Sequence, residues 1–208
     1  MAVGLAAVLA GCGGDGGPGD GRGPAPDPER DGCAPYAWYT AGDVPVRIAA
    51  AWTGGLVEDI AVQDGLAALA SRSCGLRLVD VSDPAAPRLL GVGSGLPAVA
   101  VDLLDDLVAV AEGDQGFSLH DVSAPAAPVL LCRVAVSGAV GGSRYTDAVL
   151  LDGTRLFVAG FHRQLVSYDV SDPRVPVEKG RLLLDRPGAL AAVGGRLFAG
   201  GRAVARVG

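Results

Sequence analysis

The chain of 208 residues carries 17 Lys and Arg against 23 Asp and Glu, for a net charge of −6, and it is 50% hydrophobic but only 5% aromatic. The negative balance argues against DNA or RNA as a partner, because phosphate binding needs a basic surface. The low aromatic content is unfavourable for an aromatic-lined sugar or nucleic-acid site. No stretch reaches the roughly 18 apolar residues that a membrane-spanning helix needs.

The first feature in chain order is a short apolar run of small residues that ends in Leu9-Ala-Gly-Cys12. Secretory signal peptides have such an apolar centre, followed by a small-residue cleavage site. Residues 1–11 and Cys12 resemble the signal peptide and lipobox of bacterial lipoproteins. That resemblance implies cleavage before Cys12 and lipid on its sulfur and new amino terminus, which would hold the protein on a membrane without a span.

No Lys or Arg precedes this apolar run, whereas signal peptides normally open with positive charge. The alternatives are a true start upstream of Met1, or an Ala/Gly-rich start with a chance cysteine. The next segment favours the lipoprotein interpretation. Residues 13–31 contain no large apolar residue, so 12–31 is expected to be a lipid-anchor Cys followed by a disordered Gly/Pro/Asp tether.

Residues 32–208 are expected to form the folded domain. Asp43–Gly54 resembles an outer strand that follows a proline, here Pro45. The next unit is predicted to hold four strands, at 56–63, 66–71, 76–81 and 88–92. Asp64-Gly65 is a strong hairpin turn between the first two, and the proline-bounded stretch 82–87 blocks ladder pairing before the fourth.

One phrase recurs three times: Asp80-Val-Ser-Asp-Pro-Ala-Ala-Pro87, Asp121-Val-Ser-Ala-Pro-Ala-Ala-Pro128 and Asp169-Val-Ser-Asp-Pro-Arg-Val-Pro176. Its copies start 41 residues apart (80 to 121) and 48 apart (121 to 169). A period near 40 with four short strands in each unit predicts an all-β fold, a β-propeller of four-stranded antiparallel blades.

The later units repeat the pattern of the first. Their strands are predicted at 98–102, 107–111, 116–122 and 129–134; at 148–151, 156–159, 165–170 and 177–182; and at 190–193, 196–199 and 203–207. About four blades are therefore expected. Two arrangements remain open: a ring closed by the strand at 43–54, which would remove exposed edges, or a truncated larger propeller.

The quoted phrases resemble those of LVIVD-repeat proteins, a bacterial and archaeal group of predicted β-propellers. The matching pieces are Gly75–Gly91, Gly116–Pro125 and Leu165–Pro173, and the resemblance extends from about residue 45 to the end. Ala124 stands where the second Asp of the phrase is usual, and Gln164 stands where a Gly is usual. The resemblance implies secretion or lipid anchoring, and it implies no shared catalytic residues.

The recurring Asp80, Asp121 and Asp169, with Pro84, Pro125 and Pro173 in the same corners, are interpreted as structural turn residues. An Asp side chain at such a place bonds backbone N–H groups two or three residues on. No Asp-x-Asp-x-Asp run suggests calcium, and His120 and His162, in separate units, make a poor zinc set. With no Gly-x-Ser-x-Gly elbow either, no catalytic, cofactor or metal residue is assigned.

If Cys12 carries lipid, Cys33, Cys74 and Cys132 remain. In an oxidising exterior a Cys33–Cys74 disulfide would pin the entering segment to the first complete blade. Cys132 lies among apolar residues of an outer strand and is expected to be a buried thiol.

The sequence favours a lipid-anchored, extracytoplasmic binding or scaffolding module, periplasmic or on the cell surface, with no chemistry of its own. Its connections are short apart from residues 138–145, so a small protein or peptide is the expected partner, and no cofactor is expected. The alternative is a cell-surface adhesion component or a hydrolytic enzyme that uses the propeller's central face. An enzyme would need convergent polar groups with shifted pKa values, and the sequence offers few.

Overall fold

The computed structural model describes residues 56–93, 95–136, 145–160, 164–184 and 187–200, and the backbone of residues 205–207. Within these ranges every regular element is a β-strand, so the all-β prediction is confirmed. The expected signal peptide, the tether, the strand at 43–54 and the start of the domain at residue 32 lie outside the described residues, as does His162.

The strands form consecutive antiparallel sheets, each built from neighbours in the chain. The first blade contains β1 (Val57–Gln63), β2 (Leu66–Ser71), β3 (Gly75–Asp80) and β4 (Arg88–Val92). The second contains β5 (Ala100–Leu104), β6 (Leu107–Ala111), β7 (Phe117–Asp121) and β8 (Val129–Val134). The third contains β9 (Thr146–Asp152), β10 (Arg155–Gly160), β11 (Gln164–Asp169) and β12 (Val177–Leu183). The described part of the fourth is β13 (Ala189–Val193), β14 (Arg196–Gly200) and β15 (Ala205–Val207).

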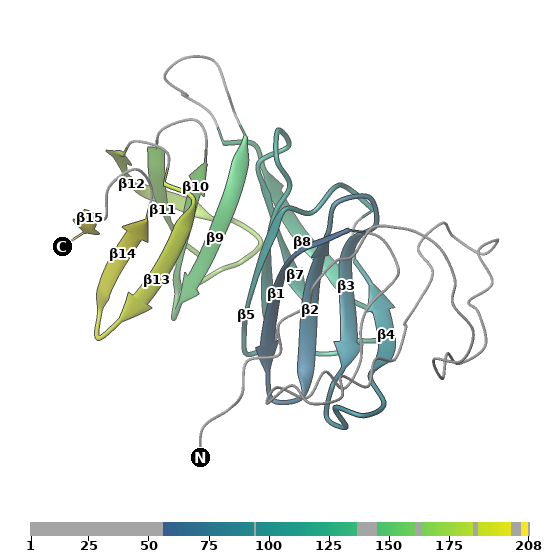
Figure 1. Cartoon of the computed structure of the whole chain (residues 1–208). Coiled ribbons are helices and arrows are strands. Elements are labelled where there is room, and N and C mark those ends of the chain that lie inside the picture. Colours follow the sequence, from purple (N-terminus) through teal and green to yellow (C-terminus); the bar gives the residue numbers. More distant parts are fainter. Residues whose placement is uncertain are drawn as a thin grey trace, which may run out of the picture.

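Figure 1 shows these sheets standing side by side in chain order, as blades of a propeller do. The first strand of each blade is its inner strand: β1 contacts β5, β5 contacts β9, and β9 contacts β13. Among the described strands, the last one of each complete blade, β4, β8 or β12, is the outer edge of its sheet. This order confirms the predicted four-stranded antiparallel blades.

The hydrophobic core lies between successive blades, because alternate side chains of each strand point to its two neighbours. Leu76 and Leu78 of the first blade pack against Val108 and Val110 of the second, and all four are fully buried. The second and third blades meet through Phe117 and other apolar residues of β7 and β9–β11. A smaller cluster that includes Leu165 and Leu197 joins the third blade to the fourth.

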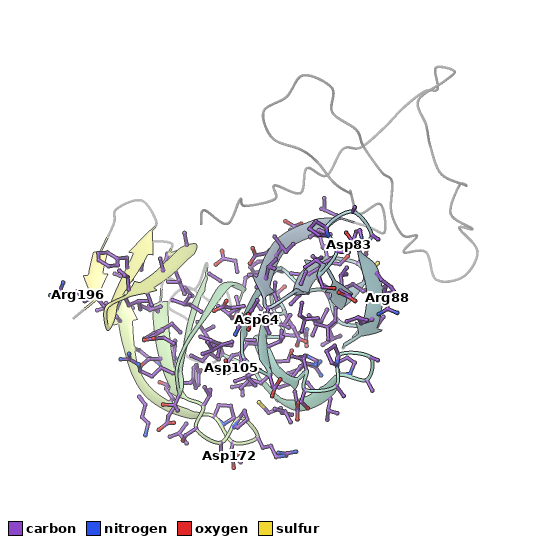
Figure 2. All side chains as sticks on the ribbon, turned by 90° about the horizontal axis from the view of Figure 1, so that it is seen from below. Asp64, Asp83, Arg88, Asp105, Asp172 and Arg196 are labelled. Atoms are coloured by element: carbon purple, nitrogen blue, oxygen red, sulfur yellow. The ribbon has the colours of Figure 1, made fainter. Side chains whose placement is uncertain are left out.

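Tight turns connect the first two strands of each blade. Asp64 and Gly65 both have positive φ, of 49° and 82°, which is the geometry of a two-residue hairpin turn with the matching strand twist. The two-residue turn of the second blade differs, because Asp105 has a positive φ, of 53°, and Asp106 does not. Figure 2 shows Asp64 and Asp105 near the middle of the molecule, with the corner residues Asp83 and Asp172 toward its rim.

At the inner hairpins, the predicted end of one strand was wrong by two residues and that of another by one. The strand predicted at 98–102 is β5, which continues to Leu104, because Leu104 pairs with Leu107 and only Asp105 and Asp106 form the turn. In the third blade Asp152 pairs with Arg155, so β9 continues one residue beyond the predicted end at 151 and the turn is Gly153-Thr154. The predicted first strand of that blade, 148–151, is extended at both ends.

Candidate functional site

The corner aspartates Asp80, Asp121 and Asp169 each follow a third strand and bind their own turn. In every corner the Oδ1 atom accepts a hydrogen bond from the backbone N–H of the serine two residues on, at 3.0, 2.9 and 3.0 Å in chain order. Hydrogen bonds from these serines hold the pKa of all three carboxyls below its usual value, at about 2 for Asp169. The described contacts of these carboxylates therefore stabilise the corner.

The prolines of the corners, Pro84, Pro125 and Pro173, occupy the second position of a tight turn. A backbone hydrogen bond closes each turn, for example from Ala86 N–H to the Asp83 carbonyl at 3.0 Å. Proline suits this position because its ring fixes φ near the value that the turn needs. Each corner is thus a rigid unit that directs the chain into the outer strand.

Two carboxylates on inner strands connect one blade to the next. Asp59 of β1 accepts a hydrogen bond from Val101 N–H of β5 at 3.0 Å. Asp102 of β5 accepts one from Leu151 N–H of β9 at 2.6 Å. Burial raises the pKa of both carboxyls, while these backbone hydrogen bonds act in the opposite direction.

A third inner-strand carboxylate, Asp147, differs from the other two. Its Oδ1 atom is buried and has no hydrogen-bond partner in the described part of the chain, and burial raises its pKa to about 6. Thr146 beside it is fully buried, with its Oγ1 also unpartnered. Among the described residues no three His, Cys, Asp or Glu side chains form a group that could hold a metal ion.

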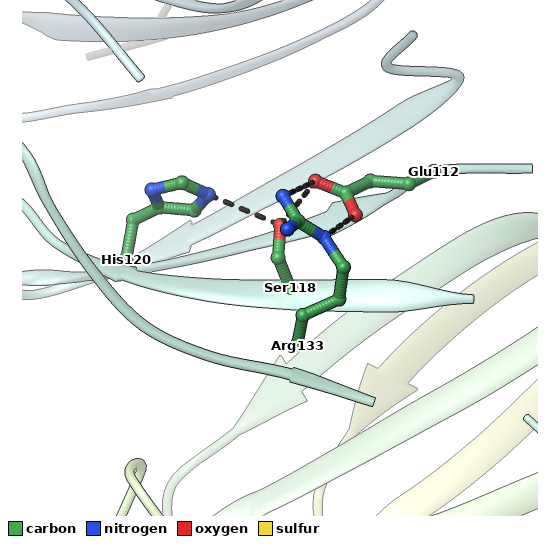
Figure 3. A network of polar contacts seen from close by, with 4 residues as sticks. All are labelled: Glu112, Ser118, His120 and Arg133. Atoms are coloured by element: carbon green, nitrogen blue, oxygen red, sulfur yellow. Dashed lines mark hydrogen bonds and ion pairs between the residues drawn. The ribbon is translucent and has the colours of Figure 1, made fainter. Parts of the chain in front are cut away.

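A buried polar network lies at one end of the second blade (Figure 3). The Arg133 guanidinium of β8 donates two hydrogen bonds to Glu112, at 2.5 Å from Nε and 3.1 Å from Nη2. The Ser118 hydroxyl of β7 lies 2.8 Å from Glu112 Oε1 and 3.0 Å from His120 Nε2. Glu112, Ser118 and His120 are buried, whereas about a third of the Arg133 side chain is exposed.

The donor and acceptor roles in this network do not suit nucleophilic catalysis. Burial lowers the pKa of His120 to about 4, so its ring is neutral at pH 7. The carboxylate of Glu112 can only accept, and it takes the Ser118 proton. His120 Nε2 must then donate to Ser118 Oγ, whereas an activating base would accept from it. Among the described residues His120 Nδ1 has no hydrogen-bond partner, so within this part of the chain the group also lacks the third member of a triad.

Strand register shows that this network is particular to the second blade. Glu112 follows β6 at the position that Ser71 occupies in β2 and Gly160 in β10. Val79 and Tyr168 stand where His120 stands, directly before the corner Asp. The network could not be predicted from sequence because its members come from different strands. The one available signal was an acidic residue closing an otherwise apolar strand.

The cysteines have different states. Cys74 is buried and disulfide-bonded. Its predicted partner, Cys33, lies outside the described residues, as does Cys12, so the pairing stays a prediction. Cys132 is a free thiol, as expected, but it is half-buried rather than buried. It sits on β8, which is an edge strand of its sheet as far as the described strands go.

A groove of about 500 Å³ lies beside the outer half of the third blade, where the fourth blade approaches it. Its floor is apolar, with Phe157, Leu165 and Leu197. Lys179 and Asp169, an ion pair 3.1 Å long, stand at its side with Gly180. The groove therefore combines an apolar floor with a charged edge.

The LVIVD-repeat model matches residues 54–92, 98–138 and 143–183, which together make up more than half of the chain. The chain belongs to the LVIVD-repeat family. Each LVIVD repeat coincides with one four-stranded blade, since the three matches contain β1–β4, β5–β8 and β9–β12. No curated protein sequence matches the chain.

Solved structures share the fold of this LVIVD-repeat chain at low sequence identity. The computationally designed Ika4 protein matches with a TM-score of 0.58 and 11% identity over 74% of this chain and 92% of that one. A functionally unknown protein from Desulfotomaculum acetoxidans DSM 771 matches with 0.60 and 12%, over 80% and 58%. The designed Ika8 protein matches with 0.57 and 11%, over 82% and 50%. The chain thus spans 58% and 50% of these last two proteins, respectively.

In the described part of the LVIVD-repeat chain, no helix has the length and apolar character that would let it cross a membrane.

Proposed function

We propose that this LVIVD-repeat protein is a lipid-anchored, extracytoplasmic binding module that catalyses no reaction of its own. The sequence supports the anchor, with the lipobox-like residues before Cys12 and a tether without large apolar residues. The buried polar network of the second blade supports the absence of catalysis. The Ser118 hydroxyl donates its proton to Glu112 and not to His120, so no base activates it as a nucleophile.

The observation that carries the proposal is the apolar character of the outer strands. Exposed large hydrophobic residues gather on the free edge strands β4, β8 and β12: Leu89, Val92, Val129, Leu130, Val177, Leu182 and Leu183. Soluble proteins usually protect such edges with charge, and apolar exposed strands mark sites where another chain binds. The expected partner is a protein or peptide that lies along an outer strand and adds to its ladder.

Capture of envelope proteins by the purified full chain tests this proposal. Val129→Lys with Leu130→Lys places two charges on the β8 edge and should abolish capture of the specific partner. Val62→Lys is the matched control, because Val62 is 59% exposed but lies on the inner strand β1. Equal capture by both variants would contradict binding at the outer strands. Turnover of a panel of hydrolase substrates would favour the enzymatic alternative instead.

A further inference from the structure

The outer strand of the third blade, β12, is more accessible than the other two outer strands (Figure 1). All seven of its residues are exposed, whereas β4 and β8 are each partly covered. Around an added Cβ at Gly180, in the middle of β12, the nearest described atom is Ser167 Oγ at 3.7 Å. An added Cβ at Gly91 of β4 would lie 2.2 Å from the Pro125 carbonyl oxygen, so the corner of the second blade covers that strand.

A β-bulge makes β12 symmetric about Gly180. Two adjacent residues of β11 pair with Glu178 and Gly180, so Lys179 between them is the extra residue of the bulge. Along the ladder, Glu178 is therefore one pair before Gly180, and Arg181 is one pair after it. The Glu178 and Arg181 side chains form an ion pair, with Nη2 2.6 Å from Oε2, so both lie on the same face of the sheet.

Two antiparallel copies of β12 centred on Gly180 would bring complementary residues together. Glu178 of each copy would stand opposite Arg181 of the other, and Val177 would stand opposite Leu182 on the other face of the sheet. Val177 and Leu182 are 50% and 40% exposed. Opposite charges and apolar side chains are both favourable cross-strand pairs. Gly180 would face itself on the axis, where no side chain obstructs the two backbones.

The other two outer strands have the same bulge but not this complementarity. In β4 the central Gly91 is covered, as described above. In β8 the central residue is Cys132, and the residues one pair away on either side are Leu130 and Arg133. Self-pairing of β8 would place an apolar side chain opposite a cation that Glu112 already binds. Among the described outer strands, complementary charges about the centre are found in β12.

We propose that two copies of this chain pair through β12, antiparallel and about a twofold axis at Gly180, so that their third blades join into one sheet. The same surface is used on both copies, so the contact closes with two copies. The inner strand β9 of the blade remains in contact with β5 and β13. This inference rests on the proposed use of exposed outer strands for binding, and it names a second copy as the partner of β12.

Charge exchange between two variants tests the pairing. Sedimentation velocity of the full chain, with Cys12→Ser to keep lipid off, should show a concentration-dependent species of twice the monomer mass. Glu178→Arg and Arg181→Glu each place like charges opposite one another, so each should raise the dissociation constant of the dimer by about tenfold or more. An equal mixture of the two variants should dimerise again, because two arginines of one chain then meet two glutamates of the other.

This design separates pairing between copies from the ion pair within each strand, which mixing does not restore. Arg155→Glu is the matched control, because it breaks an exposed ion pair on β10 and should leave the dimer unchanged. A full chain that stays monomeric would overturn the proposal, as would a mixture no more dimeric than its separate components. Val129→Lys with Leu130→Lys should dimerise normally, and Glu178→Arg should still capture the envelope partner, so failure of either proposal is recognisable.

Single cysteines test the register independently. Gly180→Cys should form a disulfide-linked dimer on mild oxidation, because only a residue on the twofold axis faces its own copy. Leu183→Cys is the control, because Leu183 is 66% exposed but lies three pairs from Gly180 along the ladder. That offset separates its two copies by about 20 Å. Both variants carry Cys132→Ser to remove the free thiol. Equal linking by the two cysteines, or no link through Gly180→Cys, would overturn the proposal.

Discussion

The Asp59 carboxylate on the inner strand of the first blade accepts the Val101 N–H of the second blade, with Oδ2 and N 3.0 Å apart. Its other oxygen accepts the Ile60 N–H at 2.9 Å. One side chain therefore connects two inner strands at the centre of the molecule, and Asp102 repeats the arrangement toward the third blade. The blades are held together by directed hydrogen bonds as well as by their apolar faces.

Asp59→Ala should lower the free energy of unfolding by about 1–3 kcal/mol, because it leaves the Val101 N–H without its acceptor. Asp59→Asn keeps an acceptor oxygen and removes a half-buried charge, so it should cost less than the alanine variant. Chemical denaturation at pH 7 measures both. Asp114→Ala, at an exposed turn, is the control and should change little. Equal losses for the alanine and asparagine variants would contradict the hydrogen-bonding role.

Asp147 should make the fold less stable as pH rises. Its pKa is raised by burial to about 6 in the folded state, above the ordinary value of 3.8. Between these two pH values the folded state holds a proton that the unfolded state has lost. The contribution of this carboxyl to the free energy of unfolding therefore falls as pH rises from about 4 to about 6. Asp147→Asn should therefore raise stability at pH 7, by about 1 kcal/mol after allowance for solvent screening.

The measurement is the difference in unfolding free energy between Asp147→Asn and the unmodified chain, taken at intervals from pH 4 to pH 8. The difference should grow across the interval up to about pH 6 and then stay level. A difference that does not depend on pH would show that Asp147 titrates normally.

His120 should make the fold less stable as pH falls. Burial lowers its pKa to about 4, so between about pH 6.5 and pH 4 the unfolded state takes up a proton that the folded state does not. Stability from this group is complete above pH 6.5 and is lost as pH falls toward 4. His120→Gln keeps a donor for Ser118 and cannot titrate, so its unfolding free energy should fall less over this interval. Parallel pH profiles for the two proteins would contradict a neutral, buried His120.

Breaking the buried ion pair of Glu112 and Arg133 should lower the free energy of unfolding more than breaking an exposed ion pair does. Arg133→Ala leaves the buried Glu112 carboxylate without its cation, at a cost of about 3 kcal/mol. Arg155→Ala removes an exposed pair with Asp152 and should cost less than about 1 kcal/mol. Urea denaturation of both variants provides the comparison. Similar small losses would mean that solvent reaches Glu112.

The disulfide of Cys74 should stabilise the fold by about 2–4 kcal/mol, because it restricts the unfolded chain. Cys74→Ser and the addition of reductant should therefore lower the melting temperature alike, while Cys132→Ser leaves it nearly unchanged. If Cys33 is the partner, Cys33→Ser must release one maleimide-reactive thiol at Cys74. Release of that thiol by Cys12→Ser instead would disprove the predicted pairing and also the lipid on Cys12.

The strands could be predicted from sequence because each blade combines a hairpin turn, apolar strands and a proline corner within about 40 residues. β6 and β8 begin and end as predicted. The turn at Asp105-Asp106 misled the prediction of β5, because neither residue is the glycine that usually marks a positive φ. The contacts of Asp59 and Glu112 could not be predicted, since they depend on how strands and blades pack against each other.

Membrane attachment through Cys12 is the basis of the proposed function, and fractionation of producing cells tests it directly. The unmodified protein should sediment with membranes and be released by detergent but not by high salt, because lipid chains rather than charge hold it there. Cys12→Ser should move the folded protein to the soluble fraction. If both proteins remain in the membrane fraction, or both are soluble, the chain is not anchored by lipid at Cys12.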